Sequence, residues 1–200
     1  MFRILLAAVD VIPAAIVLVP YFLILCWKVD RWNLQKSILY CLFSLYLAAV
    51  FSLVGIPNVT YIRMEMDLNL IPFLGMAEDF HNSILNILLF VPLGIFLPVL
   101  CEKFRRIQSA MVFGFGMSLI IEILQIFTFR ATDVNDLITN SLGTLVGFQM
   151  AHYAIARYPA IQDAVNENGT KELYAVWLMT FCVMFFIHPI LSPLIWDCIL

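Results

Sequence analysis

One stretch of the chain concentrates side chains that could do chemistry. Glu122 and Gln125 are three residues apart at the end of an apolar segment. Asp133, Asp136 and Asn140 follow at steps of three or four residues in the next segment. If both segments are helical, these steps place each set on one helical face. Carboxylates and amides placed in this way could bind a ligand through hydrogen bonds, hold a divalent cation or transfer protons.

Arg130 is the only cation in this stretch and lies between the two sets. It could pair with Asp133 or Asp136 through a bidentate contact, or it could await a phosphate or carboxylate ligand. We favour the internal pair, because the acids outnumber this cation and would repel one another without it. Asp133 also has a purely structural explanation as the N-cap of the following helix, with Asp136 near the third helical position.

The composition indicates that these side chains belong to a membrane protein. Of the 200 residues, 63% are hydrophobic and 12% are charged, which is too little polar surface for a soluble domain of this size. A membrane-spanning helix needs about 20 apolar residues. Six windows come close to this length, at 4–27, 37–55, 82–101, 109–129, 134–156 and 173–195. The sequence therefore predicts an all-α fold, a polytopic membrane helical bundle with about six transmembrane helices.

The basic residues divide unevenly between the predicted loops. One side of the membrane would carry Lys28, Arg31, Lys36, Lys103, Arg105, Arg106, Arg157 and Lys171. The other side would carry Arg3, Arg63 and Arg130. Because loops rich in Lys and Arg stay in the cytoplasm, we expect both termini and the Arg130 turn to be extracytoplasmic. The net charge of −3 argues against nucleic acid as a partner.

Three motifs, in order and spacing, resemble the VanZ-like family. The longest is Glu122-x2-Gln125-x4-Arg130-x2-Asp133-x2-Asp136-x3-Asn140-x2-Gly143-x3-Gly147. It is preceded by Asn69-Leu70-Ile71-Pro72-Phe73 and by Asn86-x3-Phe90-x-Pro92-Leu93-Gly94. The resemblance implies a protein of the bacterial cell membrane and reduced susceptibility to glycopeptide antibiotics, teicoplanin in particular. It divides the chain into a first transmembrane helix with an inner loop (1–35), a VanZ-like transmembrane domain (36–157), and an inner loop with a C-terminal transmembrane helix (158–200).

Polar side chains from four predicted spans would lie at similar depths in the membrane. With a rise of about 1.5 Å per residue, Glu122, Asn140 and Asp10 lie on the order of 10 Å below the outer surface, and Asn86 about 6 Å below it. Together with Gln125, Arg130, Asp133 and Asp136, they predict a polar cup that opens outward. Two members have alternative explanations, because Asp10 could reach interfacial water and Asn86 could bond a neighbouring helix. The glycines Gly94, Gly143 and Gly147 predict close helix packing.

Three functions fit this cup. The first is a binding or envelope-modifying protein that contacts a membrane lipid, a lipid-linked envelope precursor or a lipoglycopeptide. The second is a membrane-embedded enzyme acting on a lipid head group, although no nucleophile stands beside a base. The third is a proton-coupled transporter, for which the inner halves of the spans offer only Gln149 and His152. We expect no cofactor, with a divalent cation held by Glu122, Asp133 and Asp136 as the alternative.

Overall fold

The computed structural model describes residues 2–28, 34–62, 68–69, 71–73, 80–128, 132–158 and 169–199. The chain forms two compact units, which are described separately. The first unit contains Met1–Ile62 and Lys171–Leu200, and the second contains Arg63–Thr170.

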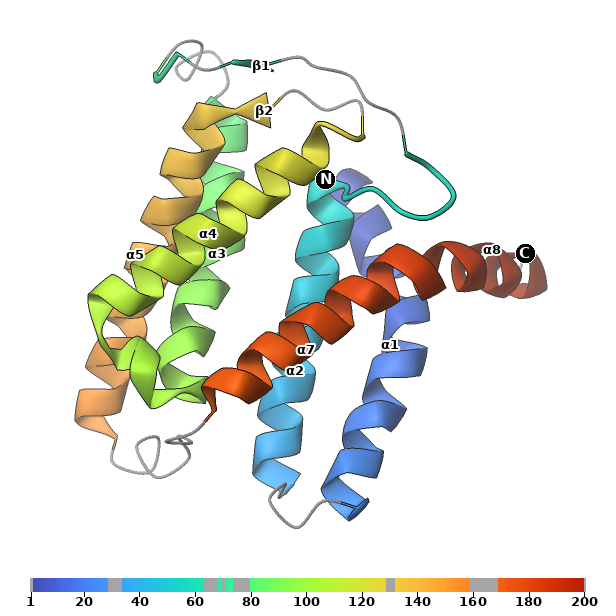
Figure 1. The fold of residues 1–200 in the computed structure, drawn as a ribbon, viewed down its shortest axis with the longest axis horizontal. Helices are drawn as coiled ribbons and strands as arrows, with labels where there is room; N and C mark the ends of the chain where they lie inside the picture. The colour runs from blue at the N-terminus through green and yellow to red at the C-terminus, as the bar shows by residue number, and fades with distance from the viewer. Residues whose placement is uncertain are drawn as a thin grey trace. The chain divides into compact units, whose positions relative to one another are not determined.

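The first unit is built from long apolar helices (Figure 1). They are α1 (Phe2–Lys28), α2 (Leu34–Val54), α7 (Thr170–Cys182) and α8 (His188–Ile199), with the π-helical turn η2 (Val183–Ile187) between the last two. α1 and α2 lie side by side. Polar contacts help to join α2 to α7: Ser44 and Thr180 share a buried hydrogen bond of 2.7 Å, and Lys36 forms a salt bridge of 2.7 Å with Glu172.

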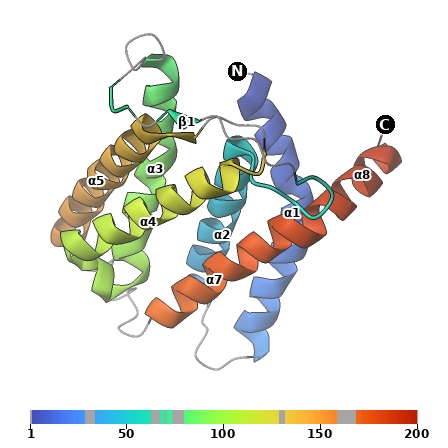
Figure 2. The same ribbon diagram turned by 45° about the horizontal axis from the view of Figure 1, so that its top comes forward.

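The second unit contains α3 (Phe80–Leu100), α4 (Ile107–Gln125) and α5 (Val134–Arg157), packed together as Figure 2 shows. The 3-10 turn η1 (Glu102–Arg105) connects α3 to α4. Two short strands, β1 (Leu68–Asn69) and β2 (Thr132–Asp133), pair in parallel beside the start of α5. These two strands are a small addition to the helical bundle.

The prediction of an all-α membrane bundle is confirmed. All six predicted spans are helical, and the last one comprises α7, η2 and α8. Within the described ranges, five helices are long and apolar enough to cross a membrane. α5 has the length, with 24 residues, but its polar face makes it less apolar. α4 ends at Gln125, earlier than predicted, because a turn follows in which Thr128 N–H and its hydroxyl both donate to the Gln125 carbonyl.

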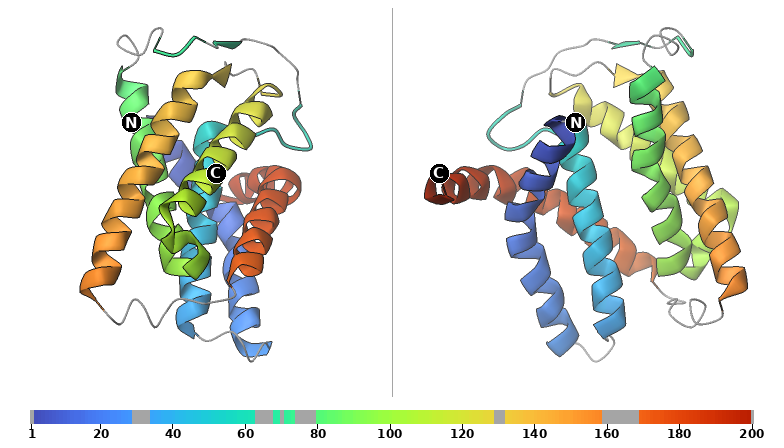
Figure 3. Two further views of the ribbon diagram at one scale, coloured as in Figure 1. Left: turned by 60° about the vertical axis from the view of Figure 1, so that its left-hand side comes forward. Right: turned by 180° about the vertical axis from the view of Figure 1, so that it is seen from behind.

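Glycines allow α3 and α5 to approach closely while running in the same direction (Figure 3). Gly143 lies against the carbonyl of Ile87, and Gly147, one turn further on, lies against the carbonyl of Val91. A Cβ at either glycine would collide with these backbone oxygens. The two helix backbones therefore pack without side chains between them, as in other small-residue packing motifs of membrane helices.

Gly94 on α3 makes the reciprocal contact. A Cβ at this position would meet the backbone carbonyl of Thr144 and the backbone N–H of Phe148. Because the obstructing atoms belong to the backbone, they cannot move aside as a flexible side chain could. The spacing of α3 and α5 is thus fixed from both helices.

We expect Gly147→Ala to destabilise the protein by about 1–3 kcal/mol, the usual cost of overpacking. The added methyl group would push α5 away from the Val91 carbonyl. Gly116→Ala on α4 is the matched control, because nothing lies within 4 Å of the position that its added methyl group would occupy. Thermal unfolding in detergent measures the difference. Equal melting temperatures for the two variants would contradict the close approach of α3 and α5.

Candidate functional site

Polar side chains face one another at successive turns of α4 and α5. The two helices run antiparallel. Glu122 on α4 lies opposite the start of α5, Ser118 lies opposite its middle, and Gly114 lies opposite its deeper part. We call the group Glu122, Asp133, Asp136 and Asn140 the Glu122 site. It occupies the region where α4 ends and α5 begins.

Glu122 is the central buried carboxylate of this site, with 2% of its surface exposed. Its Oε2 accepts a hydrogen bond of 3.0 Å from the backbone N–H of Asp133. Its backbone carbonyl accepts a second hydrogen bond, of 3.1 Å, from the Thr132 hydroxyl. The carboxylate of Asp136 is close enough to interact with it electrostatically. Glu122 therefore joins the end of α4 to the segment that starts α5.

Asp133 acts as the N-cap of α5. Its Oδ1 accepts a hydrogen bond of 2.8 Å from the backbone N–H of Asn135, which has no acceptor in the first helical turn. Its Oδ2 accepts a hydrogen bond of 3.2 Å from the Asn69 side chain. Both carboxylate oxygens thus bond to the chain itself, and the capping explanation accounts for Asp133.

Two asparagines, one in β1 and one in α5, connect the segment of β1 to the start of α5. Asn69 pairs with Asp133 in the β1–β2 register and also bonds its carboxylate. Asn135, buried in the first turn of α5, accepts a hydrogen bond of 2.7 Å from the backbone N–H of Phe73. Phe73 has a φ of 65°, an uncommon conformation for a residue other than glycine. The contacts of Asn69 and Phe73 therefore hold β1 against the first turn of α5.

Asn140 lies one turn deeper, opposite Ser118. Its Nδ2 donates a hydrogen bond of 2.9 Å to the Ser118 hydroxyl, and both side chains are buried. Its Oδ1 is also buried and has no hydrogen-bond partner among the described residues. A buried carbonyl oxygen without a donor is unfavourable, so this oxygen could accept a hydrogen bond from a ligand or a water molecule.

The structure changes the predicted depths. Because α4 ends at Gln125, Glu122 lies about 5 Å from the helix end, while Asn140 lies about 9 Å below the start of α5. The two side chains therefore occupy successive levels and not one layer. Gln125 is buried at the end of α4.

The other predicted members are placed as follows. Asn86 is partly exposed on α3. Arg130 lies outside the described residues. Asp10 belongs to the first unit, where its carboxylate accepts from Ser52 Oγ at 2.9 Å and its backbone carbonyl lies 2.9 Å from His188 Nε2. Membership of all three in one cup stays a prediction.

Sequence reasoning missed four contributors: Asn69 and Asn135 as hydrogen-bond partners, Ser118, and Thr144, whose side chain lies against Gly114. The steps of four from Gly114 through Ser118 to Glu122 could have revealed the face of α4. Nothing in the sequence pairs Asn69 with Asp133, because strand pairing across 64 residues leaves no local pattern.

The carboxyl and amide oxygens of the Glu122 site are hydrogen-bond acceptors, which could bind a ligand that carries donors. No described Lys or Arg forms a salt bridge with Glu122 or Asp133. Within the part of the chain that the structure describes, no group of three or more His, Cys, Asp or Glu side chains could hold a metal ion.

Comparisons with known proteins identify the family. The model of the family described as VanZ/LLP1 matches residues 37–157, more than half of the chain. The chain belongs to the VanZ/LLP1 family. Protein VanZ of Enterococcus faecium is 37% identical over 89 residues, which cover 43% of this chain and 53% of that protein. The match thus spans about half the length of this relative. No solved structure matches the chain.

We expect Ser118→Ala to lower the unfolding free energy by about 1 kcal/mol, the usual size of a hydrogen bond between membrane helices. The variant removes the acceptor of Asn140 Nδ2. Ser141→Ala is the control, because the Ser141 hydroxyl donates only to the Leu137 carbonyl in its own helix. Reversible unfolding in detergent compares the two. Equal stability of both variants would contradict a contribution from the α4–α5 hydrogen bond.

Proposed function

We propose that this VanZ/LLP1 protein acts at the outer face of the bacterial cell membrane and reduces susceptibility to glycopeptide antibiotics such as teicoplanin. The Glu122 site would be an outward-facing polar cup that binds a membrane lipid, a lipid-linked envelope precursor or the lipid-bearing antibiotic. Family membership supports the general role. The observation that carries the assignment to a site is the burial of Glu122 beside Asp136.

Capping explains Asp133, whereas the hydrogen bond that Glu122 accepts from Asp133 N–H needs only an acceptor and does not explain a second buried carboxyl group. The N-cap of α5 is complete with Asp133, whereas Glu122 brings a second carboxylate into an apolar helix. Ionisable groups within membrane spans are expensive and usually mark a functional site. The buried Asn140 Oδ1, one turn away, adds an acceptor for a donor on the ligand. Carboxylates and an amide carbonyl favour ligand groups such as amines and hydroxyls.

The distribution of charge in the second unit supports an outward orientation. Acidic side chains gather where α4 ends and α5 begins. The described basic side chains gather at the opposite helix ends, at Lys103, Arg105, Arg106 and Arg157. By the positive-inside rule, this distribution supports a Glu122 site outside the cytoplasm, and an extracytoplasmic position of both chain termini is part of the proposal. Lipid-linked wall precursors and a lipid-bearing antibiotic are both accessible from that side.

A labelling experiment tests this orientation. In a background lacking Cys198, we expect Ala131→Cys to react with a membrane-impermeant thiol reagent in intact cells. Arg106→Cys, between α3 and α4, should react only after the cells are opened. The reverse pattern would place the Glu122 site in the cytoplasm and would overturn the proposed envelope role.

We expect Glu122→Gln to abolish protection against teicoplanin when the gene is expressed in a susceptible host. The amide oxygen can still accept from Asp133 N–H, so the fold should persist while the charge is lost. Asp136→Asn should act in the same way.

Glu102→Gln is the matched control, because it makes the same change at an exposed position in η1. The measurement is the minimum inhibitory concentration at equal membrane expression. Full protection by both site variants would leave only capping and packing as roles for these acids.

A further inference from the structure

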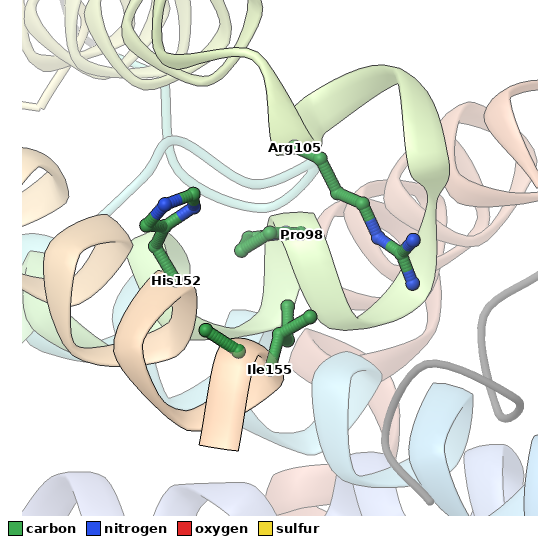
Figure 4. A pocket seen from close by; sticks show the side chains of 5 residues that line it. Pro98, Arg105, His152 and Ile155 are labelled. Carbon is green, nitrogen blue, oxygen red and sulfur yellow. The ribbon is translucent and has the colours of Figure 1, made fainter. Parts of the chain in front are cut away.

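The second unit has a hollow of about 200 Å³ at the ends of its helices opposite the Glu122 site. It is lined by Pro98 of α3, Arg105 of η1, and His152, Ile155 and Ala156 of α5. Figure 4 shows the imidazole of His152 and the guanidinium of Arg105 on either side of Pro98 and Ile155. The hollow thus combines two nitrogen-bearing side chains with an apolar floor.

Aromatic contacts support the turn that carries Arg105 and the side chain of His152. Phe104 is buried and packs edge-to-face on Phe113, with ring centroids 5.3 Å apart, which fixes the turn that carries Arg105. The imidazole of His152 stacks on Phe148 at a centroid distance of 5.8 Å and an interplanar angle of 20°. A binding site whose side chains are already positioned loses less entropy when its ligand binds.

The surrounding residues place this hollow at the surface of the membrane. Tyr153 on α5 and Tyr158, directly after this helix, are 73% and 58% exposed, and tyrosines are enriched at membrane–water interfaces. The exposed Lys103, Arg106 and Arg157 add positive charge, and Glu102 is the single acid among the described residues of η1 and the neighbouring helix ends. This charge would attract an anion, and the anions available at such a depth are lipid head groups.

We propose that the hollow binds the phosphate of an anionic membrane lipid. Arg105 would contact the phosphate through its planar donor fork, and His152 would donate a further hydrogen bond. Pro98, Ile155 and Ala156 would contact the glycerol and the first acyl carbons. Pockets for complete small molecules usually enclose about 300–1,000 Å³, so the smaller hollow suits part of a lipid better than a whole ligand.

The full-length protein in neutral detergent allows a direct test. Phosphatidylglycerol should raise the melting temperature more than phosphatidylcholine with the same acyl chains. Arg105→Gln should weaken the apparent affinity for phosphatidylglycerol by about tenfold or more, as the loss of a charge-assisted hydrogen bond predicts. Arg106→Gln is the matched control, because its side chain is exposed and does not line the hollow. Equal losses in both variants, or no preference for phosphatidylglycerol, would overturn the proposal.

A second variant separates binding from folding. Ala156→Phe would fill the hollow from the exposed end of α5 without changing any charge, and it should also remove the preference for phosphatidylglycerol. If Arg105→Gln does not fold, this variant decides the question. Full competition by inorganic phosphate would indicate a site for small anions and would overturn the assignment to a lipid.

Discussion

The hydrogen bond between the Glu122 carboxylate and the Asp133 backbone N–H is the contact on which the site depends. It joins two helices at the point where the chain reverses direction, and it does so with a group that is costly to bury. Asp133 in turn accepts hydrogen bonds with both side-chain oxygens, one from Asn135 N–H at the start of α5 and the other from the Asn69 side chain. A single buried acid thereby positions the short strand pair and the first turn of α5.

The glycine contacts provide the rigid support for this arrangement. Gly143 and Gly147 bring α5 against the backbone of α3, and the adjoining face of α5 contacts α4. On that face Thr144 fills the space over Gly114, and Asn140 reaches Ser118. The glycines of α5 thus contact α3, and the polar side chains Asn140 and Thr144 contact α4 from the adjoining face.

The sequence predicted what depends on local pattern. Apolar length located the six helical segments, and the steps of three and four located the polar face of α5. The N-cap role of Asp133 was also visible, because N-caps have a local residue preference. The depth of Glu122 was overestimated, since the hydrophobic Ile126–Phe127 pair continues the apolar run after the helix has ended in a turn. The link from Asn69 to Asp133 depends on tertiary pairing, and the hollow beside Arg105 depends on the positions of three separate segments, so neither has a signature in the sequence.

A binding titration with the purified protein in nanodiscs tests the ligand-binding role of Glu122 most directly. Teicoplanin and a lipid-linked cell-wall precursor would serve as probes. The wild type and Glu122→Gln would be compared once their melting temperatures have been shown to be equal. We expect at least one probe to bind the wild type and the variant to bind it about tenfold more weakly, in line with the loss of a hydrogen bond between the Glu122 carboxyl group and the ligand. Equal affinities for both proteins, or no binding of either probe to the wild type, would contradict a ligand-binding role for Glu122.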